Sequence, residues 1–240
     1  MIISNEILLV AGIFALYLFD SSSLLYSNEL ILSESKRSFS ATTGSSLQIG
    51  GRFLYVPNIL KPHHAHFKGS WSWRDHGAAR EFIPELLHFV DALSLPKAGC
   101  ALLAGLMFLA LPYLLLTSGK PLLLLFTLCS IYLTIAVMVH SAYRHRKALE
   151  LSRRQIALIG TEAFLCPPFA INFVRKICEK RGLKQDALAL SQRLLSRNRM
   201  LSTLAAVQER LATSIAFTDE SSKTHEEMTD FAKRLKEHHP

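Results

Sequence analysis

Two long apolar runs separated by a tight turn constrain this chain more than any other feature of its sequence. Ala98–Thr117 contains no charged residue, and as an α-helix it would rise about 30 Å, the thickness of the hydrocarbon core of a bilayer. Pro121–Tyr143 repeats the pattern and is followed by the basic cluster Arg144-His-Arg-Lys147. Helices of soluble proteins are rarely apolar on every face over this length. The sequence therefore predicts a transmembrane helical hairpin over residues 98–143.

A third apolar run lies near the N-terminus. Ile7–Phe19 carries no charge, and Glu6 is the only charged residue before it. A cleaved signal peptide has a basic segment before its apolar run and small residues at its cleavage site, and this pattern is not found here. We therefore predict a retained transmembrane anchor within residues 1–26.

The distribution of Lys and Arg predicts the orientation of these helices. With the N-terminus outside, residues 27–97 and everything after Tyr143 are cytoplasmic, and Lys120 is the only basic residue outside. Basic residues that flank transmembrane helices favour the cytoplasmic side. The pattern is typical of a bacterial inner-membrane protein with a cytoplasmic C-terminus.

The insert between the first two apolar runs, residues 27–97, combines β and α patterns. Lys36–Thr43 and Leu47–Val56 are rich in β-forming residues and predict a hairpin with a bulge at the glycine pair 50–51. Phe67–Trp73 alternates and predicts a third strand. Ala78–Leu93 has helical spacing and predicts an amphipathic helix close to the bilayer. A small cytoplasmic β element followed by a helix is thus expected.

Two features of the insert suggest binding chemistry. His63, His64 and His66 place three imidazoles close together, and neutral imidazole is a common metal ligand. Metal or haem binding is therefore an alternative to an ordinary polar loop. Trp71 and Trp73 share one face of a strand, where they would lie at the lipid headgroups, stack on a ligand, or fill the core of the small sheet. We favour the headgroup position because tryptophan combines an apolar ring with a polar N–H.

Residues 144–184 form a basic, membrane-proximal segment with an apolar centre. Ile156–Val174 is long enough to span a bilayer, but basic residues flank it on both sides and the proline pair 167–168 interrupts a continuous helix. We predict two short interfacial or re-entrant helices, or helices packed under the hairpin, with anionic lipid headgroups as their partners. The residues predicted at the membrane interface are Trp71, Trp73, Arg144, Arg146, Lys147, Arg153, Arg154, Arg175 and Lys176.

Three polar residues stand within or beside apolar runs. Asp20 follows the N-terminal run, while Glu162 and Asn172 interrupt the run at 156–174. A buried carboxylate needs a cationic partner or hydrogen bonds. We expect Asp20 at the membrane boundary, Glu162 paired with an arginine of the basic segment, and Asn172 at a helix break or bonded across helices.

Residues 185–240 form a helical tail in which acids and bases balance. Over Asp186–Phe217 leucines recur at three-, four- and seven-residue steps, as in a short coiled-coil seam. Such a seam packs internally against residues 218–239 or receives a partner, either a second copy or another protein. Because the excess positive charge lies in the membrane-proximal parts, we expect lipid contact and no nucleic-acid binding. The predicted partner-binding residues are Leu190, Leu194, Leu201, Leu204, Leu211 and Ile215.

The predicted fold is a mainly α membrane protein with three transmembrane helices, a small β-containing cytoplasmic insert and an α-helical cytoplasmic tail. The sequence contains no phosphate-binding loop, nucleophile elbow, zinc-protease motif or dinucleotide fingerprint. We therefore expect a non-catalytic accessory or scaffold subunit without a cofactor, which binds itself or a membrane complex. One alternative is a small membrane enzyme or metal- or haem-handling protein using the three histidines and Glu162. A third is a subunit of an oligomeric transporter or channel.

Overall fold

The chain folds into two compact units, each built from segments that are distant in sequence. The computed structural model describes residues 5–72, 83–118, 120–219 and 222–238. The helical unit comprises Met1–Ser22, Val56–His66 and Ile83–Arg181. The mixed unit comprises Ser23–Tyr55, Phe67–Phe82 and Gly182–Pro240 and contains nearly all the strands. The insert and the tail, which the sequence analysis treats separately, thus contribute to one unit.

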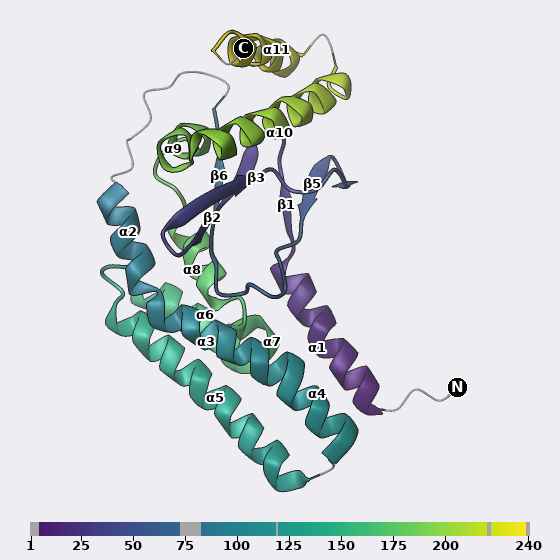
Figure 1. Ribbon diagram of the computed structural model, residues 1–240, viewed down its shortest axis with the longest axis vertical. Helices are drawn as coiled ribbons and strands as arrows, with labels where there is room; N and C mark the ends of the chain where they lie inside the picture. Colours follow the sequence, from purple (N-terminus) through teal and green to yellow (C-terminus); the bar gives the residue numbers. More distant parts are fainter. Residues whose placement is uncertain (1–4, 73–82, 119, 220–221, 239–240) are drawn as a thin grey trace. The chain divides into compact units, whose positions relative to one another are not determined.

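A pair of long helices dominates the helical unit. The first runs from Ser94 to Thr117 and the second, α5, spans Pro121–Arg144; both are long and apolar enough to cross a membrane. Figure 1 shows them side by side, joined by a short connection. The first helix consists of α3 (Ser94–Gly105), a π-helical stretch (Leu106–Ala110), α4 (Leu111–Tyr113) and a second π-helical stretch (Leu114–Ser118).

The π-helical stretches surround a proline. Pro112 has no N–H to donate to the carbonyl four residues earlier, and its ring would clash with that carbonyl in a regular helix. The backbone widens here, with the N–H of Leu111 donating to the carbonyl of Leu106. Phe108, on this widened turn, stacks on Phe14 with centroids 4.6 Å apart and meets the edge of Tyr17 at 5.1 Å. Both partners belong to α1 (Asn5–Ser21), so α1 packs against the first long helix.

Most side chains of the two long helices are exposed. Only 28% and 22% of the residues in their most apolar stretches are buried, whereas a core helix of a soluble protein would be mostly buried. In α1, Ile7, Leu8 and Phe19 are likewise exposed apolar residues. With 17 residues, α1 has the minimum length for a span, so the third predicted span stays a prediction.

Among the residues that the structure describes, four shorter helices complete the helical unit. In α2 (Ile83–Ala92) the buried residues Leu86, Phe89 and Val90 form the face expected from the sequence; residues 78–82 lie outside the described part of the chain. The predicted break at the proline pair is confirmed: α6 (Arg153–Leu165) ends there, and α7 (Pro167–Ala170) and α8 (Phe173–Arg181) follow. Since α6 contacts α5 and α8 contacts α3, these helices pack against the hairpin.

The mixed unit contains two small sheets whose pairing differs from the predicted hairpin. In one, β5 (Arg52–Tyr55) lies between β1 (Ser23–Leu25) and β4 (Gln48–Ile49). In the other, β2 (Glu29–Ser35) lies between β3 (Ser38–Thr42) and β6 (Ala65–Ser70). The segment 36–43 therefore pairs with β2, and the prediction that it pairs with residues 47–56 is wrong. Gly50 and Gly51, with φ of +58° and +74°, form the turn between β4 and β5 instead of a bulge.

Three helices belong to the mixed unit. In the described part of the tail, the predicted continuous helix over 186–217 is divided into α9 (Ala187–Leu194) and α10 (Arg197–Ala216), and α11 (Lys223–His238) follows. The backbone is extended at Leu195 and Ser196, which breaks the helix. α9 contacts β2, α10 contacts β3, and α11 contacts α10 (Figure 1).

Buried Arg210 joins α10 to both hairpins of this unit. Its guanidinium lies 3.8 Å from the ring centroid of Phe53 and donates hydrogen bonds to the carbonyls of Glu29 (2.7 Å) and Tyr26 (3.4 Å). Burial lowers the pKa of Arg210 to about 10, against the opposing effect of Glu29. Even at that value the side chain is charged at neutral pH, so it binds both carbonyls as a cation.

The close approach of α3 to α5 makes a testable prediction. A Cβ added at Gly99 would lie 2.4 Å from Met138 Cγ and Sδ, whereas one at Gly105 would meet nothing within 4 Å. We expect Gly99→Leu to lower the free energy of unfolding in detergent by about 1–3 kcal/mol through overpacking. Gly105→Leu, the matched control, should leave it unchanged or raised. Equal effects of the two substitutions would contradict this packing.

Candidate functional site

A cluster of charged and polar side chains lies where α1, α6 and α8 meet, and it brings together the three polar residues singled out in the sequence. Lys176 Nζ lies 2.9 Å from Asp20 Oδ1 and 2.8 Å from Glu162 Oε1. Asn172 Nδ2 donates a hydrogen bond to Asp20 Oδ2 at 2.8 Å. One lysine thus bridges two carboxylates from different helices, and the amide fixes the orientation of Asp20.

Arg175 binds the end of α1 from the same side. Its guanidinium donates to the backbone carbonyls of Asp20 and Ser21 and pairs with Glu179 at 3.5 Å. The carbonyls of the last helical turn have no partner within the helix, and a cation there is favoured by the helix dipole. Arg175 therefore caps α1. Its charge is buried and interacts with groups of the protein, so Arg175 is not a surface cation.

The side chains of the cluster differ in how far they are exposed to solvent. Asp20 and Lys176 are each 11% exposed, while Glu162 is 46% exposed. The expectation that Glu162 is buried and paired with an arginine is wrong, because it lies at the open edge and pairs with a lysine. Asn172 is buried at the break between α7 and α8, as expected. Asp20 lies at the end of α1, and its position at a membrane boundary stays a prediction. The cluster fastens three helices together by charge.

The three histidines lie beside one another in the helical unit. The rings of His63 and His64 have centroids 4.9 Å apart, and those of His64 and His66 lie 6.2 Å apart. The Nδ1–H of buried His66 donates to the carbonyl of His64 at 2.9 Å. Burial, with nearby Arg175 contributing, lowers the pKa of His66 to about 4. Burial likewise lowers the pKa of His63, with Lys97 and Lys61 acting in the same direction. Both imidazoles are therefore neutral at pH 7.

Neutral imidazoles suit a metal, but a ligand set is not assembled around them. In the part of the chain that the structure describes, no group of three or more His, Cys, Asp or Glu side chains is arranged to hold a metal ion. Buried Cys178 is the nearby thiol, and burial raises its pKa, so it is protonated and unreactive at pH 7.

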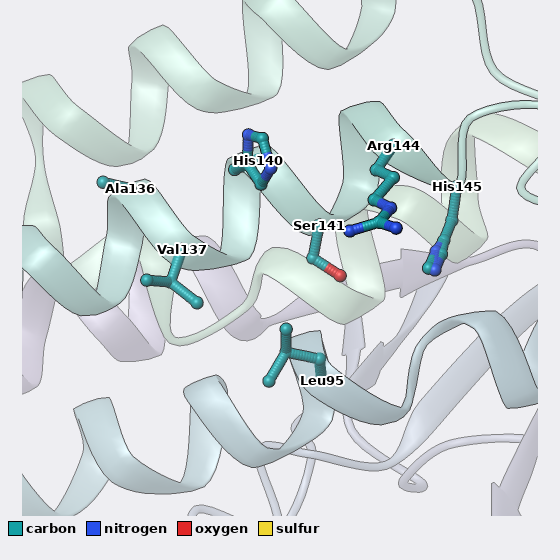
Figure 2. Close-up of a pocket in the computed structure, with 7 residues that line it drawn as sticks. All are labelled: Leu95, Ala136, Val137, His140, Ser141, Arg144 and His145. Carbon is teal, nitrogen blue, oxygen red and sulfur yellow. The ribbon is translucent and has the colours of Figure 1, made fainter.

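Two apolar grooves flank the last turns of α5. The first, about 370 Å³, lies between α5 and the start of α3; Figure 2 shows Val137 and Ser141 facing Leu95 across it, with Arg144 and His145 at one end. The second, about 500 Å³, lies between α5 and α6 and is lined by Val139, Tyr143, Ile156, Ala157 and Phe164, with Arg153 at its rim. Ala136 and His140 line both grooves. His140 was not among the predicted site residues, although it is an ionisable residue in an otherwise apolar run.

The predicted membrane-interface residues occupy different environments. Trp71 is 1% exposed and exchanges hydrogen bonds with Asn28. It belongs to the buried core, so the headgroup position favoured for it is wrong. Trp73 lies outside the described residues. Arg175 and Lys176 are bound within the cluster described above. The side chains left on the surface are Arg144, Lys147, Arg153 and Arg154, with Arg146 partly exposed over the ring of Tyr143.

Most of the predicted partner-binding leucines face the interior of the mixed unit. Leu190, Leu204 and Leu211 are buried, and Leu194 and Ile215 are half-buried. Leu201 is 50% exposed and is therefore open to a partner. The leucine periodicity thus arises mainly from packing of α9 and α10 on the unit's own strands.

Comparison of the chain with protein-family models finds no match, and neither a curated protein nor a solved structure is significantly similar to it.

The bridge from Lys176 to two carboxylates should contribute measurably to stability. Replacing Lys176 by Met leaves the Asp20 carboxylate mostly buried without a cation, which should lower the free energy of unfolding by about 2–4 kcal/mol. Lys180→Met, at an exposed position of the same helix, should change it by less than about 0.5 kcal/mol. Adding Asp20→Asn to Lys176→Met should recover part of the loss, because the pair then disappears together. Strictly additive effects would show that the two side chains are not coupled.

The low pKa of His66 predicts a pH dependence of stability. An unfolded histidine titrates near 6.5 and folded His66 near 4, so between these values the unfolded chain binds more protons and stability falls as the pH falls. The loss should reach about 3 kcal/mol by pH 4. His66→Gln should remove most of this dependence, while exposed His88→Gln should keep it; chemical unfolding in detergent at pH 4 to 7 measures both.

Proposed function

We propose that the chain is a non-catalytic integral membrane scaffold or accessory subunit. Its long helix pair and α1 anchor the helical unit in a membrane, and the mixed unit is presented at the cytoplasmic face for self-association or binding of a membrane-complex partner. The observation that carries this proposal is the exposure of apolar side chains along both long helices. Such surfaces are stable against lipid and unstable against water.

The charge distribution supports an orientation for the hairpin. Arg144 ends α5, and the exposed residues Lys147, Arg153 and Arg154 follow within a few positions. Lys120 alone stands near the opposite ends of the two helices. By the positive-inside rule the end of α5 is cytoplasmic, the turn at Lys120 is outside, and the N-terminus is outside. We assign this membrane to the bacterial inner membrane.

Two exposed apolar side chains, one on α10 and one just beyond its end, support partner binding. Leu201 is 50% exposed and Phe217, just beyond the helix, is 82% exposed. Large apolar side chains at the surface of a soluble unit favour association with another protein. We place the partner-binding surface on these two residues, because the remaining leucines of the predicted seam are buried or half-buried.

A second candidate function rests on the histidines. Three imidazoles lie in succession at 4.9 and 6.2 Å, and the two whose pKa is lowered are neutral at pH 7. Neutral imidazoles are common metal and haem ligands, so the three histidines support a metal- or haem-handling role, while Glu162 pairs with Lys176 instead. Stoichiometric metal or haem absorbance in the purified protein, lost in His64→Ala, would establish it over the scaffold.

The scaffold proposal is tested in membranes prepared from cells that express the full chain. We expect the protein to stay in the membrane after alkaline carbonate treatment. A cysteine at Lys120→Cys should react with a membrane-impermeant maleimide in intact cells, and one at Arg154→Cys only after permeabilisation; the unmodified chain corrects for its native thiols. The detergent-extracted complex should have a protein mass above the 26.9 kDa of one chain.

Release by carbonate would overturn the membrane anchor. Reversed labelling would overturn the orientation alone, and a protein mass of 26.9 kDa would contradict the scaffold role.

A further inference from the structure

The two grooves beside α5 form a single feature divided by a ridge. His140 and Ala136 line both grooves, so they form the crest between them. Each groove has apolar walls and arginine at its rim: Arg144 in the first and Arg153 in the second. The side chains at 136, 140 and 144 lie one helical turn apart on one face of α5.

These arginines carry charge that the described protein does not neutralise. In the described part of the chain, neither Arg144 nor Arg153 forms an ion pair. The nearest acid in the connection, Glu150, is paired with Arg181 at 3.5 Å. Arg153 is also the first residue of α6, where the helix dipole disfavours a cation. An anion bound here would neutralise the charge of both arginines and would offset the unfavourable position of Arg153 at the start of α6.

We propose that the ridge and its two grooves bind one diacyl anionic phospholipid, with an acyl chain in each groove and the phosphate on Arg144 and Arg153. This inference rests on the membrane location proposed above. The depths agree with it, because Ala136 lies about 12 Å and His140 about 6 Å along the helix axis from Arg144. The phosphate, the glycerol and the start of the acyl chains would follow each other in that order.

Two features distinguish this site from general lipid contact. The grooves have volumes of about 370 and 500 Å³ and share one crest, which matches two chains joined at one headgroup. Arg144 and Arg153 each line one groove. The other exposed Lys and Arg residues of the segment 144–154 are Lys147 and Arg154, and they line neither groove. Attraction to an anionic surface alone would not distinguish these four residues.

The test is lipid titration of the purified full chain in mild detergent, read by native mass spectrometry. Phosphatidylglycerol and phosphatidylcholine with identical acyl chains are the probes. We expect one phosphatidylglycerol retained per chain, and phosphatidylcholine to bind at least about fivefold more weakly. Arg144→Gln and Arg153→Gln should each weaken phosphatidylglycerol binding about fivefold, as loss of one cation near a lipid phosphate implies.

Matched variants make the result decisive. Lys147→Gln and Arg154→Gln should stay within about twofold of the natural chain. Ala136→Trp fills both grooves and should abolish retention of either lipid, whereas Leu133→Trp, exposed on the same helix and lining neither groove, should not. All the basic positions are exposed, so these substitutions do not remove core contacts.

Equal weakening by all four basic substitutions would overturn the site, because it would indicate surface charge alone. Equal retention of the two lipids, or no retained lipid, would also overturn it. Release of the protein by carbonate would instead count against the membrane anchor, so the two proposals fail in distinguishable ways.

Discussion

The apolar surface of the two long helices is the constraint on which the rest of the helical unit depends. Fully burying a leucine side chain contributes about 1.5–3 kcal/mol, and both helices leave large apolar side chains, such as Leu109 and Leu122, more than 70% exposed. A surface of this kind is more stable against an apolar medium than against water. At the end of α5 the chain turns polar: Arg144 ends this helix, Ser152 caps α6, and the exposed Arg153 begins it.

The charged cluster solves a problem that follows from this segregation. Where α1 ends, backbone carbonyls and a carboxylate face mostly protein, and each would be costly to bury without a partner. Arg175 satisfies the carbonyls, while Lys176 neutralises Asp20. The adjacent residues Arg175 and Lys176 of α8 thus serve different purposes. Lys176 also pairs with Glu162, which connects α6 to the cluster. Coulombic attraction between these side chains fixes the positions of α1, α6 and α8. Apolar contacts alone would allow these helices to slide along one another.

Local patterns predicted local structure well, and distant pairing poorly. The long helices were predictable because all faces are apolar, and the helix break because proline acts on its own turn. The strand β2 (ELILSES) was missed because its polar second half resembles a loop. Asp20 was identified as polar in an apolar setting, but its partners Asn172 and Lys176 are about 150 residues away, beyond any periodic signal. The leucine periodicity of α10 is expected whether the helix packs on a sheet of its own unit or on a partner protein. The sequence therefore could not distinguish internal packing from partner binding.

The interleaving of the two units has a consequence for synthesis. The chain passes between them after residues 22, 55, 66, 82 and 181, so the early hairpins need helices that are translated last. About 150 residues separate β2 from α9, which at ~5–20 residues per second is ~8–30 s of translation. During that interval Leu30 and Leu32, fully buried in the finished protein, have no helix to cover them, and an uncovered apolar strand is a template for aggregation. The face of β2 that is buried in the finished protein is therefore completed only after the C-terminal helices leave the ribosome.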